Sequence, residues 1–217
     1  MKLFVWDLHG TLEQGNEHAV MEMSNQVLAS FGYNQQFNSR HAAQLYGLKW
    51  YQYFEFLLPA EPAEKHIALQ AACFALSNSS EGTAIIAKHM QPSRNAVMVL
   101  DAIRQKHEQV LISNTVPESL PKFIDALGMR RFFAPANALA VNQHAREAKR
   151  TKHDALTGYT KHRQYDEIIV VGDSESDMRL AQAAGAKAYL YAHAGSTFRS
   201  NLGDHKINDL KEVLQEL

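Results

Sequence analysis

Short apolar segments recur along the chain and predict buried β-strands. Each has four residues, is rich in β-branched or aromatic side chains, and is too short for most helices. The segments cover residues 3–6 (LFVW), 110–113 (VLIS), 168–171 (IIVV) and 188–191 (AYLY). Runs of this kind, apolar at nearly every position, are typical of parallel strands that are covered on both faces.

Amphipathic stretches between the later segments predict helices. One covers residues 93–107 and is opened by Ser93; the other covers residues 176–185 and is closed by Gly185. Alternation of strand and helix predicts an α/β fold, in which helices pack on both faces of a parallel sheet.

Residues 15–90 interrupt this alternation. They contain no convincing strand, and their apolar residues recur at helical spacing. We therefore expect an all-helical cap domain at residues 15–90, inserted into an α/β core made of residues 1–14 and 91–217. An aromatic run at residues 50–56 (WYQYFEF) is expected to form the core of the insert rather than a ligand pocket.

Length, charge and cysteine content narrow the class of protein. At 217 residues, the chain is long enough for one core with a sizeable insertion. A formal charge of −1 gives no electrostatic reason to expect binding to nucleic acid or to an anionic membrane. Cys73 is the only cysteine, which excludes an internal disulfide framework. No stretch approaches the roughly 20 apolar residues that span a bilayer, so we expect a cytoplasmic protein without membrane contact.

Polar residues follow the predicted strands at the points where they end. Asp7 follows the first strand, Ser113 and Asn114 end the second, and Asp173 and Asp177 follow the third. Ligands of open parallel sheets bind at the carboxyl ends of the strands. We therefore expect these side chains to meet at one edge of the sheet.

Such a set suits phosphoryl transfer through an acyl phosphate. A carboxylate can attack phosphorus, and water can then cleave the product. Because one anion attacks another, the charge must be neutralised, which Mg²⁺ bound by carboxylates can do. A lysine upstream of the third strand, Lys149 or Lys152, can hold the remaining phosphate oxygens.

Four motifs in this order resemble those of the haloacid dehalogenase superfamily of hydrolases, which are mostly Mg²⁺-dependent phosphatases. They are D-L-H-G-T-L from Asp7, I-S-N-T around Ser113, T-K-H-D-A-L around Lys152, and G-D-S-E-S-D ending at Asp177. The resemblance covers almost the whole chain. It implies a Rossmann-like three-layer core with a parallel sheet, plus the inserted helical cap.

The resemblance also implies roles for single residues. Asp7 would be the nucleophile, Ser113 and Asn114 would bind the phosphoryl group, and Lys152 would bridge phosphate and nucleophile. The setting T-K-x-x-A-L and the spacing to the third strand favour Lys152, with Lys149 as the alternative. The metal would be Mg²⁺, and its ligands would be Asp7, Asp173 and the backbone carbonyl of His9. Asp177 would either be a further ligand or orient the groups that ligate the metal.

His9 is a departure from the family pattern, in which phosphatases usually carry a second aspartate as general acid and base. Imidazole can perform both tasks, since its unperturbed pKa of about 6.5 suits protonation of a leaving oxygen and activation of water. Two alternatives remain: other superfamily chemistry, such as cleavage of the C–P bond of a phosphonate, or a pseudoenzyme that binds metal and phosphate. Metal-free dehalogenation does not explain the carboxylate pair Asp173 and Asp177.

Lys49 in the predicted cap falls where caps of related enzymes reach into the active site. It would contact an anionic substrate, or simply face solvent. The sequence as a whole predicts Mg²⁺-dependent hydrolysis of a small phosphorylated metabolite, a phosphomonoester, with Asp7, His9, Ser113 and Lys152 as the catalytic residues. Both a monomer and a homodimer are compatible with the sequence.

Overall fold

The structure, a computed structural model, describes residues 1–45, 47–142 and 150–217. The chain divides into two compact units. Unit 1, the sheet unit, comprises Met1–Gln14 and Pro92–Leu217, and unit 2, the helical unit, comprises Gly15–Gln91. The segments that join them, β2 (Glu13–Gln14) and β3 (Gln91–Pro92), form a two-stranded sheet.

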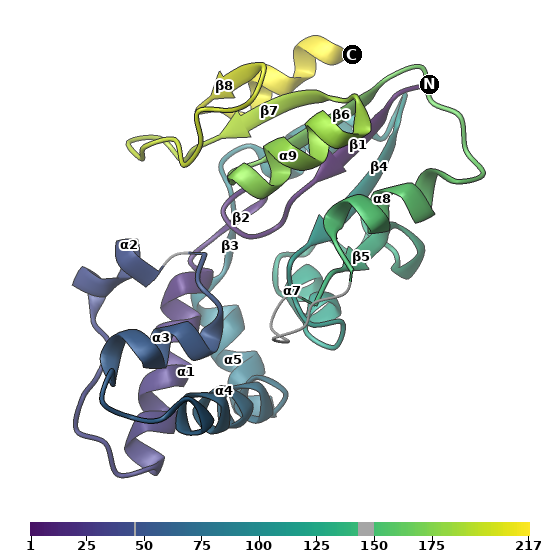
Figure 1. Cartoon of the computed structure of the whole chain (residues 1–217). Coiled ribbons are helices and arrows are strands. Elements are labelled where there is room, and N and C mark those ends of the chain that lie inside the picture. Colours follow the sequence, from purple (N-terminus) through teal and green to yellow (C-terminus); the bar gives the residue numbers. More distant parts are fainter. Residues whose placement is uncertain (46, 143–149) are drawn as a thin grey trace. The chain divides into compact units, whose positions relative to one another are not determined.

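The sheet unit is built on a six-stranded sheet with the strand order β5-β4-β1-β6-β7-β8, in which neighbouring strands are parallel (Figure 1). The predicted α/β fold with a parallel sheet is thereby confirmed, and the four predicted strands lie at its centre. The strands are β1 (Leu3–Trp6), β4 (Glu108–Ser113), β5 (Ala138–Ala140), β6 (Ile168–Gly172), β7 (Lys187–Tyr191) and β8 (His205–Ile207).

Strands β5 and β8 are the two edge strands, and the sequence pattern did not predict them. Each has only three residues; β8 (HKI) has no apolar run, and β5 (ALA) is apolar but lacks the β-branched and aromatic side chains of the central strands. Their backbone pairing with β4 and β7 defines them as strands. Whether an edge segment forms a strand depends more on its pairing with the neighbouring strand than on its own residues.

Helices cover both faces of the sheet. On one face, α8 (Lys152–Thr160) and α9 (Glu175–Ala184) pack over β4, β6 and β7 (Figure 1), and their apolar side chains join a core with Leu3 and Val5. On the other face, Trp6 donates a buried hydrogen bond to Gln109 (3.0 Å), which in turn donates to the backbone of α6 (Ala96–Ile103). The other helices in the described part of this unit are α7 (Leu120–Ala126), η2 (Pro135–Asn137) and η3 (Leu210–Glu216).

Helix boundaries follow local signals only in part. Gly185 ends α9 with a left-handed backbone (φ 62°), as the sequence predicted. The predicted start at Ser93 is wrong by about one turn, because Asn95 adopts a left-handed conformation (φ 65°) and α6 begins at Ala96.

The register of the strands determines which residues lie side by side where the strands end. Trp6 at the end of β1 is the partner of Leu111 in β4 and of Val171 in β6. The backbone N–H of Asp7 donates to the carbonyl of Val171 (3.0 Å), so Asp7 continues the strand direction before the chain turns away. The carboxyl ends of these three neighbouring strands therefore lie at one edge of the sheet.

The helical unit contains α1 (Asn16–Ser30), η1 (Ser39–His41), α2 (Ala42–Leu45), α3 (Trp50–Leu57), α4 (Ala63–Ser77) and α5 (Ser80–His89). Its aromatic residues act mainly as core: Trp50 and Phe54 are buried, and Trp50 donates a hydrogen bond to Ser24 (2.7 Å). Phe56 departs from this pattern, since it is exposed.

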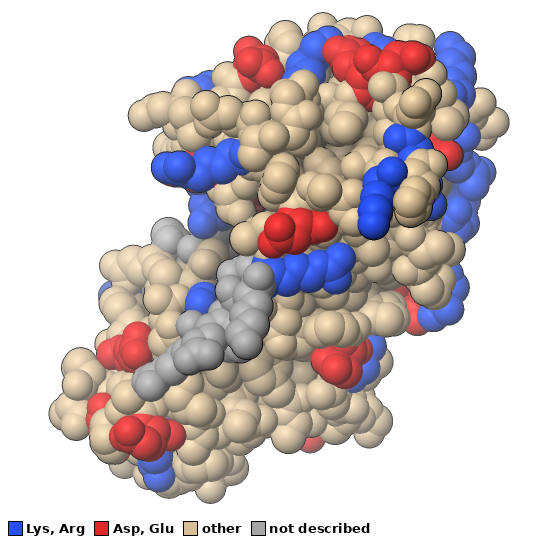
Figure 2. Space-filling view, turned by 45° about the vertical axis from the view of Figure 1, so that its right-hand side comes forward, with Lys and Arg blue, Asp and Glu red and all other residues tan. Residues whose placement is uncertain are grey.

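Charged side chains are mixed on the surface. On the face shown in Figure 2, basic and acidic residues both occur among large uncharged areas, as the near-neutral formal charge leads one to expect. Among the described residues, no helix combines the length and the apolar character needed to cross a bilayer.

Candidate active site

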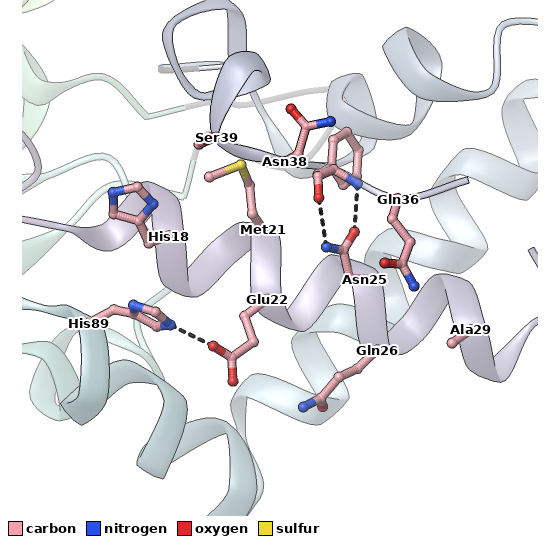
Figure 3. Close-up of a pocket in the computed structure, with 11 residues that line it drawn as sticks. His18, Met21, Glu22, Asn25, Gln26, Ala29, Gln36, Asn38, Ser39 and His89 are labelled. Atoms are coloured by element: carbon pink, nitrogen blue, oxygen red, sulfur yellow. Dashed lines mark hydrogen bonds and ion pairs between the residues drawn. The ribbon is translucent and has the colours of Figure 1, made fainter. Parts of the chain in front are cut away.

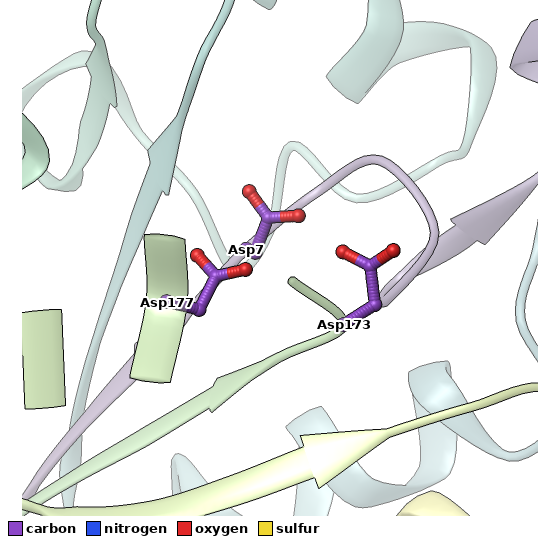
Figure 4. A group of neighbouring side chains, drawn as sticks. All are labelled: Asp7, Asp173 and Asp177. Carbon is purple, nitrogen blue, oxygen red and sulfur yellow. The ribbon is translucent and has the colours of Figure 1, made fainter. Parts of the chain in front are cut away.

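Three buried carboxylates meet at the carboxyl ends of β1 and β6. Asp7 follows β1, Asp173 follows β6, and Asp177 lies in the first turn of α9. Each offers an oxygen within 4.8 Å of the oxygens of the others, and Figure 4 shows the three side chains converging. Within the described residues, this is the one group of histidine, cysteine and acidic side chains with the spacing of a metal site.

Lys152 joins two of these carboxylates. Its Nζ lies 2.5 Å from Asp7 Oδ1 and 2.6 Å from Asp177 Oδ1, and the side chain is buried. Lys152 is the first residue of α8, whose N-terminus is capped by hydrogen bonds between Thr151 and Asp154. The alternative lysine, Lys149, lies outside the described residues.

The charge of the cluster is not balanced within the site. Burial raises the pKa of Asp7 to about 7; Lys152 opposes this rise, and Asp177 adds to it. Burial also raises the pKa of Asp173. Burial by itself lowers the pKa of Lys152, but the neighbouring carboxylates outweigh it and the pKa is raised. When all three carboxylates are ionised, Lys152 and Arg199, whose Nη1 lies 2.7 Å from Asp173 Oδ2, leave one negative charge in excess, which favours a bound cation.

The donor set of this cluster fits Mg²⁺. Magnesium prefers carboxylate oxygens and retains several water molecules, so two or three carboxylates suffice. Asp7, Asp173 and Asp177 could hold such an ion, and the resemblance adds the backbone carbonyl of His9. Soft metals, in contrast, would call for thiolate ligands, and Cys73 is buried in the helical unit.

Asp177 is held from three sides. One carboxylate oxygen contacts Lys152, and the other accepts hydrogen bonds from the hydroxyl (2.5 Å) and the backbone N–H (3.2 Å) of Ser174. The third side is the backbone of Gly172, against which the side chain lies so closely that no Cβ would fit. The rotamer of Asp177 is therefore set by its surroundings.

Ser113 and Asn114 stand at the end of the neighbouring strand β4. The hydroxyl of Ser113 is buried and has no hydrogen-bond partner among the described residues. A buried hydroxyl without a partner costs free energy, unless a ligand supplies the missing hydrogen bond. Asn114 is half-buried directly after the strand.

His9 lies in the tight turn that follows β1. Its Nδ1 is 2.9 Å from Oε1 of Glu13, and its ring meets the edge of Phe123 with 5.0 Å between ring centroids. Burial lowers the pKa of His9, but the hydrogen bond and the charge of Glu13 outweigh burial and raise it. Imidazole and carboxylate thus form a pair beside Asp7.

Two partners in this site were not predicted from the sequence. Glu13 lies four residues after His9, a spacing that is informative only once the turn is known. Arg199, whose Nη1 lies 2.7 Å from Asp173 Oδ2, comes from the segment between β7 and β8. No motif marks Arg199. It follows β7, which neighbours β6 on the side away from β1.

Lys49 belongs to the helical unit. It is half-buried and directly precedes α3. The structure describes this unit by itself, so the substrate contact expected of Lys49 stays a prediction.

The helical unit also has a pocket of its own, of about 480 Å³, beside α1 (Figure 3). Several of its polar side chains are already paired. Asn25 exchanges two hydrogen bonds with the backbone of Phe37, and Glu22 contacts His89 (2.6 Å) and Lys88 (2.7 Å). This pocket contains none of the predicted site residues.

The fold is of the α/β class, and the buried carboxylate cluster is its candidate active site. The chain belongs to the haloacid dehalogenase-like hydrolases, whose family model matches residues 1–185. Comparison with curated proteins found no significant match.

Solved structures with the same fold cover nearly the whole chain. A predicted phosphoglycolate phosphatase from Haemophilus somnus has a TM-score of 0.77 at 16% identity, covering 99% of this chain and 96% of that one. A hydrolase of the same superfamily, subfamily IA, from Geobacter sulfurreducens has a TM-score of 0.74 at 15% identity, with 100% and 96% covered. A haloacid dehalogenase-like protein from Streptococcus pneumoniae has a TM-score of 0.69 at 14% identity, with 99% and 97% covered. At these identities, the likeness establishes the fold.

Proposed function

We propose that this protein hydrolyses a small phosphomonoester with the help of Mg²⁺, through a phosphoryl group carried on Asp7. The observation that carries this proposal is the position of the Asp7 carboxylate. One of its oxygens lies within 4.8 Å of carboxylate oxygens of Asp173 and Asp177, and the side chain contacts Lys152. A nucleophilic carboxylate, metal ligands and a neutralising ammonium are the groups that this chemistry requires.

Mg²⁺, held by Asp7, Asp173, Asp177 and the carbonyl of His9, would neutralise charge on the phosphoryl group. The protein's own groups do the rest. The free oxygen of Asp7 attacks phosphorus while the bond from phosphorus to the leaving oxygen breaks. Lys152, Ser113 and Asn114 hold the phosphoryl oxygens, and the hydroxyl of Ser113 thereby gains the partner that it lacks among the described residues.

His9 carries the proton in both half-reactions. Its imidazolium donates a proton to the leaving oxygen, so the product departs as an alcohol. The neutral imidazole then takes a proton from the water that attacks the phosphorylated Asp7, which releases phosphate and restores the starting state. The contact of His9 with Glu13 supports this role, because a general base is commonly oriented by a third group.

In this proposal the helical unit acts as a cap that selects the substrate. Lys49 of this unit contacts the anionic part of the substrate. A cap that excludes water until the phosphoryl group has been transferred would protect the reaction from side products.

The test is hydrolysis of an aryl phosphate by the purified protein, with Mg²⁺ and with a chelator. Asp7→Asn is compared with Asp125→Asn, which changes an exposed carboxylate in α7. Turnover that needs Mg²⁺ and Asp7, but not Asp125, supports the proposal. Thermal stabilisation by a phosphate analogue without turnover of any phosphomonoester would indicate a binding protein instead, and turnover of phosphonates alone would indicate C–P cleavage.

A further inference from the structure

The chain after β1 folds back so that Glu13 lies beside His9. The carbonyl of Leu8 accepts hydrogen bonds from the backbone N–H groups of Thr11 (3.2 Å), Leu12 (3.0 Å) and Glu13 (3.2 Å). Gly10 allows this tight turn with its positive φ of 79°. His9 and Glu13 also form an isolated β-bridge. All these residues belong to the sheet unit, so the arrangement is local to it.

Glu13 is a buried carboxylate in contact with a partly accessible imidazole. Its side chain is 1% exposed and that of His9 is 24% exposed, so water reaches the histidine but not the glutamate. The same oxygen, Oε1, accepts a hydrogen bond from the backbone N–H of Gly10 (3.3 Å). This second contact holds the carboxylate in place, and the carboxylate holds the ring.

The contact determines which ring nitrogen carries the proton. A carboxylate only accepts hydrogen bonds, so Nδ1 of His9 must be the donor. In the neutral ring, Nε2 is then the nitrogen with a free electron pair. The edge contact with Phe123 restricts rotation of the ring as well.

We propose that Glu13 is a positioning residue for His9: it fixes the ring orientation and the tautomer in which Nδ1 carries the hydrogen and Nε2 exchanges protons with the reactants. This proposal rests on the proposed function of His9. It explains why histidine can stand at this position. Imidazole has two nitrogens and a rotatable ring, so it needs a partner that selects one nitrogen, whereas a carboxylate has two equivalent oxygens.

The first experiment is ¹⁵N NMR of the histidine side chains in the metal-free protein at alkaline pH, where the imidazole is neutral. His9 signals are assigned by their loss in His9→Ala. The expected spectrum has a protonated Nδ1 and an unprotonated Nε2. In Glu13→Leu the hydrogen moves to Nε2, while Glu13→Gln retains the original tautomer through its amide oxygen. A wild-type ring with the hydrogen on Nε2 would overturn the proposal.

The second experiment is steady-state kinetics. Glu13→Leu should lower kcat by about 10- to 100-fold, less than the full loss in His9→Ala, with KM within about threefold of wild type. Glu13→Gln should recover most of kcat. In the His9→Ala background, Glu13→Leu should have no further effect, because the residue acts through the ring. An equal loss in both backgrounds would show a merely structural role and refute the proposal.

The two experiments separate this proposal from the proposed function. The tautomer is read without turnover, so a fixed tautomer in a protein that hydrolyses no phosphomonoester would refute the function and leave the positioning intact. If Glu13→Leu does not fold, Glu13→Gln and His9→Ala still carry the spectroscopic test, since the wild-type tautomer alone can contradict the proposal.

Discussion

Gly172 and Asp177 approach so closely that residue 172 has no room for a side chain. A Cβ built on Gly172 would lie 2.3 Å from both Cβ and Cγ of Asp177. The absence of a side chain at the end of β6 therefore lets the first turn of α9 approach the strand. This approach brings the Asp177 carboxylate to Lys152, with 2.6 Å between Nζ and Oδ1.

Gly172→Ala should therefore disrupt the site through a single methyl group. The methyl pushes Asp177 away from Lys152, and we expect overpacking to cost about 1–3 kcal/mol of stability and kcat/KM to fall at least about tenfold. Gly158→Ala is the matched control, since no described atom outside its own helix and chain neighbours lies within 4 Å of its Cβ position, and alanine favours the helix α8. Unfolding curves and kinetics of both variants check this, and wild-type activity in Gly172→Ala would contradict it.

Lys152→Met should destabilise the metal-free protein strongly. Lys152 is the buried counter-charge of Asp7 and Asp177. Removal of one partner from a buried ion pair leaves an uncompensated charge and costs about 3–5 kcal/mol. Chemical denaturation at neutral pH without metal measures this loss, with the exposed Lys161→Met as control. A loss no larger than that of the control would show that the buried carboxylates do not need Lys152.

His9→Ala should slow turnover without weakening the metal site. General acid–base catalysis contributes about 10²–10⁴-fold, and this factor should disappear from kcat. The affinity for Mg²⁺ should stay nearly unchanged, because the expected metal ligand is the backbone carbonyl, which the substitution retains. Kinetics and calorimetric titration with Mg²⁺ measure the two effects, with the exposed His162→Ala as control. Wild-type rates would refute the role of the side chain.

Glu216 links the two ends of the chain and should make stability depend on pH. Burial raises its pKa, but hydrogen bonds from Lys187, Tyr189 and Lys2 outweigh burial and lower the pKa to about 2. Because the folded-state pKa lies below the unfolded one, this carboxylate stabilises the fold above about pH 4.5. The contribution is lost as the pH falls towards 2.

Glu216→Gln should therefore cost about 2–3 kcal/mol at pH 7 and much less near pH 2. Denaturation curves at several pH values check this, and the exposed Glu118→Gln serves as control. A cost that does not depend on pH would show that the charge of Glu216 contributes nothing beyond its packing.

The sequence by itself determined the central strands and the residues that follow them. Apolar runs with β-branched side chains are a local signal, and parallel strands bring their carboxyl ends to one edge whatever the details of packing. Asp7, Ser113 and Asp173 could therefore be placed at one edge of the sheet before any coordinates were known.

Only the tertiary structure decided which side chains pair at that edge. Glu13 reaches His9 because a turn folds back on itself, Arg199 reaches Asp173 from a different strand end, and Gly172 admits Asp177 because it lacks a Cβ. Each of these contacts depends on distances of a few ångströms between segments whose approach is set by packing. A pattern of apolar and polar residues determines which face a side chain occupies, but such pairings follow only from the packed chain.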